Sequence, residues 1–587
     1  MKNASDMLET FALREEREDK VMTIREAIKR FIHPGQQIHV AVTHNCSYAA
    51  LHEIMRQFHH KNPRFTLIMR GIRDTAVLLL HLGLVKKVLT AFSGNVYPWY
   101  GPNRVVREVY EKKEVELEEW TILTLPLRLM AAALGLPFVP TRSLVNSDLA
   151  KMNEGNFLIQ DDPFGGEPIG LVRALSPDIS IVHGLAADRA GNTILTAPYS
   201  ESVWGAKASK NGVIVTVEKL VSTEFIRAHS HLVKIPAYMV RSVSVEPFGA
   251  HPGGMWVQKV EGLEGYGEDY AFMAEFNALC QDPAALDRWT EEWILKSPSF
   301  DAYLKKLGKK RLKELAYAAR ADYWQKDLKE VLASVGPKEP SPAELMVITA
   351  ARKLVEIIPH RGYRTILAGA GTANLAAWTA KYLLERNGYE AELMVELGYF
   401  GNSPRPGEPF LLNYGNFHTC KMMTDTLDTL GVFTGGGYNR CIGVLGGGQV
   451  DKTGNVNSSW PSRDRYLTGS GGANDVASGA AETMVIMSQS RDRFLSRVPF
   501  VTAPGKRVRV LISQYGLYEK QAGEDEFTLT GYLRETPDLM EEEAVRRIKE
   551  TCGWDLKVAS HLKPIGPPQL EELTLLRMFD PHRYYLK

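Results

Sequence analysis

Residues 441–455 read CIGVLGGGQVDKTGN and join an apolar run, a glycine-rich turn and a D-x-x-G-N motif. The apolar run is typical of a buried strand, and an aspartate followed by Gly-Asn is typical of a tight turn. A second D-x-x-G-N motif at residues 188–192 (DRAGN) follows a similar apolar run at 179–183 (ISIVH). Two copies of one strand–turn unit indicate that the chain contains an internal duplication.

A second matched feature supports the duplication. Residues 37–42 (QIHVAV) precede a helical pattern at 48–58, and residues 365–369 (TILAG) precede a similar pattern at 375–384. Buried apolar strands that alternate with helices indicate βα units around a parallel sheet. We therefore predict an α/β protein made of two similar open α/β domains, packed around a shared cleft where a ligand site would form.

The segment SVGPKEPSP at residues 334–342 divides the chain. It holds three prolines and one glycine, which cannot continue a helix or a central strand. Helical patterns lie on both sides, at 299–332 and at 343–358. We expect a first domain at residues 1–333, a linker at 334–342 and a second domain at 343–587.

Composition excludes several classes of protein. The 587 residues include 44% apolar and 24% charged residues, which is ordinary globular usage. A net charge of +1 gives no field that would attract nucleic acid or anionic lipid, so we expect neither as a partner. The five cysteines contain no C-x-x-C pair, and we expect no metal site. With no apolar signal segment in the first twenty residues and no span long enough for a bilayer, we expect a cytoplasmic protein.

Three glycine-rich segments are candidates for ligand contact. Residues 365–374 (TILAGAGTAN) resemble a dinucleotide-binding turn, but the third glycine of that fingerprint falls at Asn374 and no ribose-binding acid follows. A tight βα turn, or a turn whose N–H groups face an oxyanion, also fits. The clusters at 445–451 and 468–475 indicate close approach of the backbone to a ligand, or flexible loops.

Glu396 ends an apolar strand and stands two residues before a glycine, in the segment LMVELGYFGNSP at 393–404. A carboxylate at the carboxyl edge of a parallel sheet lies where α/β proteins build their sites. A strand-end glutamate can equally be solvated or ion-paired. The local pattern alone leaves both interpretations open.

These segments resemble a known family. Residues 446–457 (GGGQVDKTGNVN) and 468–474 (TGSGGAN) are similar to the β-subunit signature of glutaconate CoA-transferase and its class I CoA-transferase relatives, and 395–398 (VELG) resembles the stretch that carries its nucleophilic glutamate. Residues 133–138 (ALGLPF) and 249–253 (GAHPG) resemble the α-subunit. The resemblance covers nearly the whole chain, as α-like and β-like subunits fused in one polypeptide.

The resemblance implies a CoA-transferase that moves CoA from an acyl-CoA to a free carboxylic acid. Glu396 would be the nucleophile and would carry CoA as a glutamyl-CoA thioester. Coenzyme A would be a co-substrate, with no permanently bound cofactor, and the assembly would be a homo-oligomer, a dimer or a tetramer. The oxyanion and CoA-binding residues would be Gly369, Ala370, Gly371, Gly447, Gly448, Gln449, Gly471, Gly472, Ala473 and Asn474.

The N-terminal domain should contribute the wall around the acyl group. Residues 92–103 (FSGNVYPWYGPN) are dense in small polar and aromatic residues, and Ser93 lies in a segment similar to one that contacts substrate in the α-subunit. The expected pocket residues are Ser93, Asn95, Tyr97 and Trp99. A surface loop in which Trp99 only packs is the alternative.

Two other functions remain open on the same scaffold. One is hydrolysis of a CoA thioester, including ring-opening C–C hydrolysis, for which Glu118 and Glu119 could supply a general base, although a charged run on a helix is usually solvated. The other is a non-catalytic sensor that binds acyl-CoA. The sequence departs from the family at Ala373, where many β-subunits have proline, and in the aromatic segment at 92–103. These departures leave the acyl group undetermined.

Overall fold

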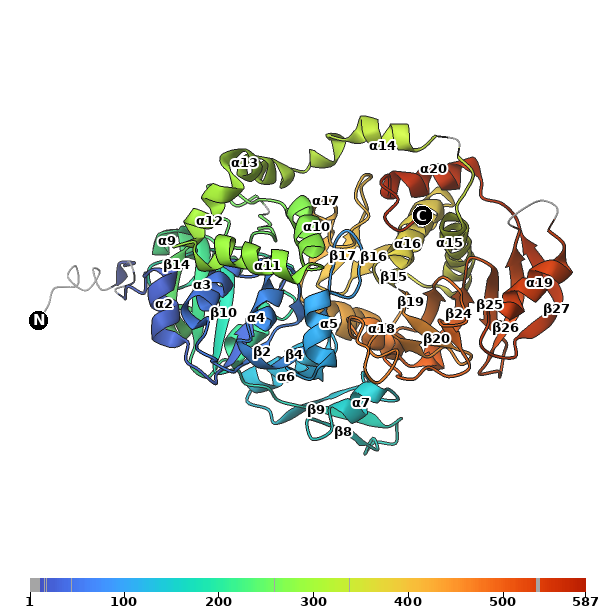
Figure 1. Ribbon diagram of the computed structural model, residues 1–587, viewed down its shortest axis with the longest axis horizontal. Coiled ribbons are helices and arrows are strands. Elements are labelled where there is room, and N and C mark those ends of the chain that lie inside the picture. The colour runs from blue at the N-terminus through green and yellow to red at the C-terminus, as the bar shows by residue number, and fades with distance from the viewer. Residues whose placement is uncertain are drawn as a thin grey trace, which may run out of the picture.

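The computed structural model describes residues 11–14, 16, 18–43, 45–257, 259–336, 338–534 and 539–587. Two α/β halves lie side by side along the long axis, the N-terminal half in blue to green and the C-terminal half in yellow to red (Figure 1). Each half is built on a sheet with a parallel centre. The α/β fold class expected from the sequence is confirmed.

The N-terminal sheet runs parallel through β14-β12-β10-β1-β2-β4-β6, and β11 and β13 add an antiparallel edge at β10. Its strands are β1 (Gln37–Val40), β2 (Phe65–Ile68), β4 (Val85–Thr90), β6 (Glu116–Glu119), β10 (Ile179–Ala187), β11 (Thr193–Ile194), β12 (Val213–Leu220), β13 (Val233–Ile235) and β14 (Val240–Val245). Its helices include α2 (Ile24–Phe31), α3 (Tyr48–Phe58), α4 (Leu78–His81), α5 (Arg104–Glu111), α6 (Thr124–Ala133), α8 (Ser202–Ala208), α9 (Thr223–Ala228), α10 (Tyr270–Leu279) and α11 (Pro283–Thr290). Every residue of β10 is buried, as expected for a central parallel strand.

The C-terminal sheet has the order β18-β17-β16-β15-β19-β22-β24-β25-β26-β27, with β16, β15, β19, β22 and β24 parallel. Its strands are β15 (Thr365–Ala368), β16 (Glu392–Val395), β17 (Tyr399–Asn402), β18 (Met422–Met423), β19 (Cys441–Leu445), β22 (Glu482–Ile486), β24 (Val508–Ile512), β25 (Gly516–Lys520), β26 (Phe527–Leu533) and β27 (Lys557–Ile565). Its helices are α15 (Pro342–Arg361), α16 (Thr372–Arg386), α17 (Tyr414–Phe417), α18 (Ala473–Gly479), α19 (Glu541–Glu550) and α20 (Leu570–Phe579). The apolar strands and helices of this half form one large core.

The two halves repeat one local topology. In the N-terminal half β1 leads through α3 to β2, and in the C-terminal half β15 leads through α16 to β16, with parallel pairing in both. The D-x-x-G-N turns are also alike. The carboxylate of Asp188 accepts hydrogen bonds from the N–H groups of Gly191 and Asn192, and that of Asp451 accepts them from Thr453 and Asn455. These shared features agree with the duplication inferred from the sequence.

The segment between the halves lies between α14 (Leu328–Ser334) and α15. Before it, α12 (Phe300–Leu307), α13 (Lys309–Ala318) and α14 cross over the top of the molecule (Figure 1). α15 begins where Ser341 caps the helix and accepts a hydrogen bond from the N–H of Glu344, whose side chain accepts one from the N–H of Ser341. Pro337 of the expected linker, like residues 1–10, lies outside the described residues.

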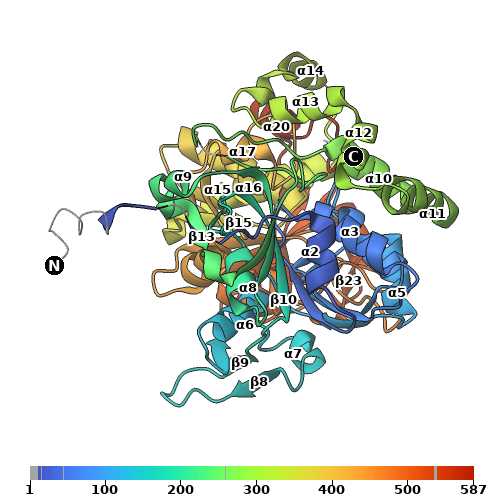
Figure 2. The ribbon, with the colours of Figure 1, turned by 90° about the vertical axis from the view of Figure 1, so that its left-hand side faces the viewer.

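Smaller elements complete the fold. A three-stranded arm projects from the N-terminal half and contains β7 (Phe138–Thr141), β8 (Phe157–Gln160) and β9 (Ile169–Arg173), near α7 (Asp148–Met152) (Figure 2). The remaining strands are β3 (Gly71–Ile72), β5 (Phe92–Ser93), β20 (Gln449–Asp451), β21 (Val456–Asn457) and β23 (Phe494–Leu495). None of the helices in the described part of the chain is both long enough and apolar enough to cross a membrane.

Buried hydrogen bonds join the halves beside the cleft. Thr121 donates from Oγ1 to Asp475 Oδ1 at 2.6 Å, and the N–H of Leu123 donates to Asp475 Oδ2 at 3.1 Å. The N–H of Leu144 donates to Asn474 Oδ1 at 2.8 Å. Because Asn474 and Asp475 lie at the start of α18, the N-terminal half helps to fix the glycine loop that precedes this helix.

We expect Trp378→Ala to destabilise the C-terminal half. Trp378 on α16 is 1% exposed and packs edge-on against Phe579 of α20, with ring centroids 5.5 Å apart. Removal of a buried indole leaves a cavity and costs about 3–5 kcal/mol. Urea unfolding followed by circular dichroism should show a lower midpoint. The control Leu570→Ala, at a residue that is 70% exposed, should leave the midpoint almost unchanged, and equal shifts for both variants would contradict this account.

Candidate active site

A cavity of about 390 Å³ lies between the two halves. The N-terminal half contributes Phe92 and Tyr100 to its wall, and the C-terminal half contributes Glu396 and the glycine loops at 446–448 and 469–472. Several of these segments follow the carboxyl ends of parallel strands, where open α/β sheets place their ligand sites. The expected cleft is therefore present as a pocket to which both halves contribute.

Glu396 is the first residue after β16. Its main-chain carbonyl accepts a hydrogen bond from Thr429 Oγ1 at 2.9 Å, which holds the strand end in place. Gly398 has φ +116°, and a Cβ at this position would lie 2.3 Å from the carbonyl oxygen of Thr424. Gly472 is required for space, because a Cβ there would lie 2.4 Å from Glu396 Oε2. The sequence V-E-L-G thus folds into a turn that aims the glutamate at the glycine loop.

Burial raises the pKa of the Glu396 carboxyl to about 7, and the positive charge of Arg70 opposes this shift. Within the described residues no hydrogen bond to the carboxylate oxygens of Glu396 is found, so the ionised form gains little from its protein neighbours. A desolvated carboxylate that is partly ionised near neutral pH is a stronger nucleophile than a solvated one. This environment differs from the solvated or ion-paired glutamate that the local sequence also allowed.

Most of the expected oxyanion and CoA-binding residues line the cavity. They are Gly369, Ala370, Gly447, Gly448, Gly471, Gly472 and Ala473. Four of their N–H groups are already used: Gly369 donates to Val444, Gly448 to Asn457, Gly471 to Ala91 and Ala473 to Ser470. In the described part of the chain, the N–H groups of Ala370, Gly447 and Gly472 have no protein acceptor. These three are the candidates for donors to a bound ligand.

Three expected residues of this set lie behind the cavity wall. Gly371, with φ +89°, begins α16 and faces Tyr585. The side chain of Gln449 bonds Asn457 and the carbonyl of Asp492. Asn474 is fully buried and donates to the carbonyl of Thr502 while it accepts from Leu144. Their contacts are structural, since they hold the loops that form the wall.

The expected acyl-pocket side chains do not line the cavity. Ser93 is buried, and its Oγ lies 3.2 Å from the Oη of Tyr110. Asn95 Oδ1 accepts from Asn103, and the Tyr97 hydroxyl donates to Glu408 at 3.0 Å. Trp99 is 51% exposed. The same segment instead contributes Phe92, Val96, Tyr100, Gly101 and Pro102 to the wall.

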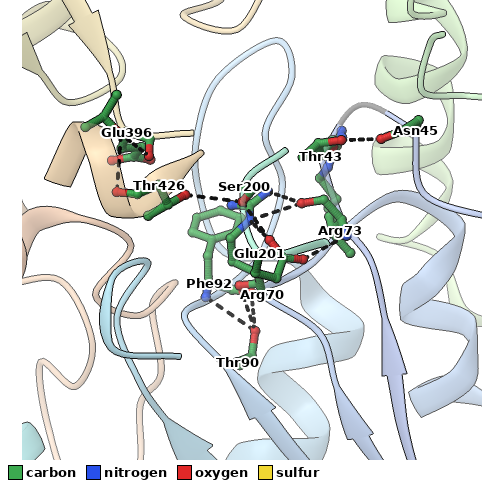
Figure 3. Close-up of polar contacts among 12 residues, drawn as sticks. Thr43, Asn45, Arg70, Arg73, Thr90, Phe92, Ser200, Glu201, Glu396 and Thr426 are labelled. Carbon is green, nitrogen blue, oxygen red and sulfur yellow. Dashed lines mark hydrogen bonds and ion pairs between the residues drawn. The ribbon is translucent and has the colours of Figure 1, made fainter. Parts of the chain in front are cut away.

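Three residues that were not predicted from the sequence line the cavity on the side of the N-terminal half: Arg70, Arg73 and Thr43. Figure 3 shows both arginines on the blue ribbons and Glu396 on the tan ribbon of the C-terminal half. Arg70 follows β2 by two residues, and Thr43 follows β1 by three. A search for polar residues just after the predicted strand at 37–42 would have found Thr43, but no strand was predicted at 65–68, so Arg70 had no such signal.

The sequence left Glu118 and Glu119 open as a general base or as a solvated run on a helix. The helical interpretation is wrong, because both side chains are buried at the end of strand β6. Glu118 Oε1 lies 2.7 Å from Arg128 Nη1. Glu119 Oε1 accepts from Ser459 Oγ at 2.6 Å and from the N–H of Ser470 at 2.8 Å, and burial raises its pKa to about 7. Neither carboxylate lines the cavity, so Glu119 supports the glycine loop from outside.

Comparison with known proteins finds one family that part of the chain resembles. Residues 21–246 match the family model described as Coenzyme A transferase. This part of the chain is therefore similar to the coenzyme A transferases. No cluster of His, Cys, Asp and Glu side chains suited to a metal ion occurs among the described residues.

The relatives include both subunits of one CoA-transferase. One subunit of 3-oxoadipate CoA-transferase from Pseudomonas knackmussii is 29% identical over 49% of this chain and 98% of its own length, and the other is 26% identical over 41% and 93%. One of the glutaconate CoA-transferase subunits from Acidaminococcus fermentans is 28% identical over 50% and 93%. An uncharacterised protein of Archaeoglobus fulgidus is 32% identical over 51% of this chain, which spans 64% of that relative.

A solved structure agrees with the fold along almost the whole chain. Acyl-CoA transferase from Escherichia coli O157:H7, described as a thioester complex with CoA, superposes with a TM-score of 0.63 and 15% identity. The match covers 94% of this chain and 97% of the other. At this identity the likeness concerns the fold, and it shows that a single chain can carry both halves of this architecture.

We expect Glu396→Gln to stabilise the protein at high pH only. A carboxyl whose pKa is raised on folding from 4.5 to about 7 destabilises the folded state as pH rises through that interval. The amide removes this cost. Urea unfolding should therefore show a stability gain for the variant above pH 7 that vanishes below pH 4.5. A stability gain that did not change with pH would contradict the conclusion that the Glu396 carboxyl is buried and weakly solvated.

Proposed function

We propose that this chain is a CoA-transferase that moves CoA from an acyl-CoA to a free carboxylic acid through a thioester on Glu396. The observation that carries the proposal is the buried carboxylate of Glu396, which faces a cavity between the two halves beside backbone N–H groups that have no protein acceptor among the described residues. The match of residues 21–246 to the Coenzyme A transferase family model supports it, and two relatives are CoA-transferases for 3-oxoadipate and glutaconate.

The reaction proceeds in two balanced halves. The Glu396 carboxylate attacks the thioester carbonyl, the C–S bond breaks and CoA leaves as a thiolate, so that a mixed anhydride forms. The thiolate then attacks the glutamyl carbonyl, releases the donor acid as a carboxylate and leaves the glutamyl-CoA thioester. An acceptor carboxylate repeats these steps in reverse order. No proton, metal or electron is consumed.

The cavity supplies two things that this chemistry needs. Each tetrahedral intermediate places negative charge on an oxygen, and the N–H groups of Ala370, Gly447 and Gly472 are the available donors. One well-placed donor lowers such a barrier by about 3–4 kcal/mol. The wall is otherwise rich in glycine and apolar residues, including Leu411 and Leu412, which disfavours water near the anhydride.

The domain arrangement belongs to the same proposal. We assign residues 1–333 to an α-subunit-like domain, 334–342 to a linker and 343–587 to a β-subunit-like domain. The support is that the two subunits of 3-oxoadipate CoA-transferase match 49% and 41% of the chain. A homo-oligomer, dimer or tetramer, and a cytoplasmic location are further proposals, the latter supported by five free cysteines.

We expect incubation with an acyl-CoA to give a CoA adduct on Glu396. Intact mass spectrometry should detect the adduct, borohydride should reduce one glutamyl residue, and Glu396→Ala should lower turnover at least about a thousandfold. Turnover should fall as pH drops below 7, because the protonated carboxyl is not nucleophilic. Glu392→Gln, on the same strand but paired with Lys421 at the surface, is the matched control and should keep full turnover.

The same assay separates the three candidate functions. A transferase gives parallel, ping-pong initial-rate lines and needs a carboxylic acid acceptor. A hydrolase releases CoA at the full rate in buffer alone. A sensor binds acyl-CoA without consuming it. A CoA adduct on a residue other than Glu396, or full turnover by Glu396→Ala, would contradict the assignment of Glu396 as the nucleophile.

We expect both domains to be required for turnover. A protease site placed in the segment between α14 and α15 allows the full-length protein to be cut after it has folded. The cut protein should keep most of its activity, because the halves remain joined through buried contacts such as Thr121 with Asp475. Separation of the fragments in denaturant should abolish activity, and mixing during refolding should restore it.

Two results would contradict the shared cavity. One is full turnover by the isolated C-terminal fragment, and the other is loss of activity on cutting alone while the fragments still co-elute. A second protease site in the arm between β8 and β9, whose residues do not line the cavity, provides the control for damage by the protease itself.

A further inference from the structure

The small sheet of the arm has one covered face and one open face. β9 is its central strand, with β7 on one side and β8 on the other, and both pairings are antiparallel. Residues directly opposite one another in antiparallel strands share a face. Val139, Val172 and Phe157 form one such row, and Val172 and Phe157 belong to a buried core cluster that includes Trp120. This inner face is therefore packed against the body of the molecule.

The outer face of the arm is apolar. Its middle row consists of Pro140, Leu171 and Leu158, which lie opposite one another, and Leu158 is 61% exposed. Phe138, two residues before Pro140 on the same face, is 48% exposed. Single exposed apolar side chains are ordinary, but an apolar face that crosses a whole sheet marks a contact surface. In Figure 2 the arm projects from the lower end of the molecule, and these exposures show that no element of the described chain covers its outer face.

Opposite charges lie at the two ends of this face. Arg173 lies opposite Phe138 at one end, two residues beyond Leu171. Asp161 comes directly after β8 at the other end, where the turn to β9 begins. Both side chains are exposed, and in the described part of the chain neither the guanidinium nor the carboxylate has a hydrogen bond or an ion pair. Each charge is therefore available to a partner from outside the chain.

An apolar face with opposite charges at its ends is complementary to a second copy of itself. A two-fold axis that runs along the middle row, between two stacked sheets, places each row on its own copy and reverses the strands. Arg173 lies two residues from that row on one side, and Asp161 lies three residues from it on the other. At about 3.3 Å per residue their positions along the strands then differ by about 3 Å, and the spacing between neighbouring strands adds about 5 Å across the sheet. A long arginine side chain spans such an offset, so each end can form an ion pair between copies.

The turn between β8 and β9 fits the same arrangement. Phe164 in this turn is 96% exposed, and Leu136, at the opposite end of the arm, is 46% exposed. The two-fold rotation brings the turn of one copy to the end that carries Leu136 and Phe138 in the other. The arrangement thus covers three apolar side chains that a single chain leaves in water.

The charge of the turn argues against a lipid surface as the occupant. Asp161, Asp162 and Glu167 all lie in the turn, and the ion pair of Glu167 with Lys506 of the C-terminal half neutralises only one of them. Anionic membranes attract basic segments and repel acidic ones. A second copy, by contrast, brings Arg173 to this turn.

We infer that the outer face of the arm is a contact between two copies of this chain. The two arms stack about a two-fold axis, with Leu158 buried in the apolar centre and Arg173 of one copy paired with Asp161 of the other. This inference names a surface for the homo-oligomer of the proposed function. It does not depend on the transfer chemistry, because no residue of β7, β8 or β9 lines the cavity.

The test is the mass of the full-length protein in solution. Sedimentation equilibrium of the wild-type protein at micromolar concentration should give an even multiple of the 65.6 kDa chain mass. Leu158→Asp should halve this mass and raise the dissociation constant at least about 30-fold, because it places a carboxylate without a partner in the apolar centre. Leu570→Asp on α20, where Leu570 is 70% exposed, is the matched control and should leave the mass unchanged.

Charge reversal decides the orientation of the two copies. Arg173→Asp and Asp161→Arg should each raise the dissociation constant at least about 10-fold, because each places like charges together at both ends of the contact. An equimolar mixture of these two variants should recover the wild-type mass, because both ends of the mixed pair again carry opposite charges. Both positions are exposed, so these variants keep the test decisive if Leu158→Asp does not fold.

Three results would overturn the inference. They are a wild-type mass that is an odd multiple of 65.6 kDa, an unchanged mass for folded Leu158→Asp, and no recovery of mass in the mixture. The CoA adduct on Glu396, measured on the same samples, separates the inference from the proposed transfer. The expected masses with no adduct on the wild-type protein would support the arm contact and refute the transferase. An adduct together with an unchanged mass for Leu158→Asp would refute the arm contact and support the transferase.

Discussion

The carboxylate of Glu396 is held where few groups can solvate it, and this constraint governs the structure around it. A solvated glutamate can stand at any exposed strand end. A desolvated glutamate needs surrounding walls that exclude water and offer few polar groups to its carboxylate. The walls come from glycine loops, whose main chain approaches closely, and from aromatic and aliphatic side chains of the other half. Gly472 shows how closely the wall approaches Glu396, because even a methyl group at this position would collide with the carboxylate.

The glycine loop at 469–472 depends on the N-terminal half for its position. Glu119 accepts from the N–H of Ser470, and the N–H of Gly471 donates to the carbonyl of Ala91. Asp475, in the first turn of α18, accepts a hydrogen bond from Thr121. Burial raises the pKa of the Asp475 carboxyl to about 7. Loops rich in glycine lose much entropy when they become ordered, and these contacts between halves offset that cost. The pocket is therefore a property of the interface rather than of either sheet.

Much of this arrangement follows from the sequence, and the exceptions have physical reasons. The helix expected at residues 48–58 is α3, and Glu396 was placed correctly at a strand end because hydrophobic runs define buried strands well. The segment at 92–103 is irregular, so no period indicates which side chains face inward, and Tyr100 rather than Trp99 lines the cavity. Arg70 was missed because the short strand β2, which it follows, was not predicted from the sequence. Glu118 and Glu119 were misassigned because buried ion pairs such as that with Arg128 are invisible to a pattern of charges.

The connection between α14 and α15 has a consequence for how the cavity behaves in dilute solution. Two separate polypeptides form a shared site only in proportion to their concentrations, and unequal synthesis leaves an excess of one without a partner. A covalent connection replaces this bimolecular equilibrium with an effective local concentration set by the length of the connecting segment. Each molecule thus carries its own complete cavity, with fixed one-to-one stoichiometry, however few copies are present.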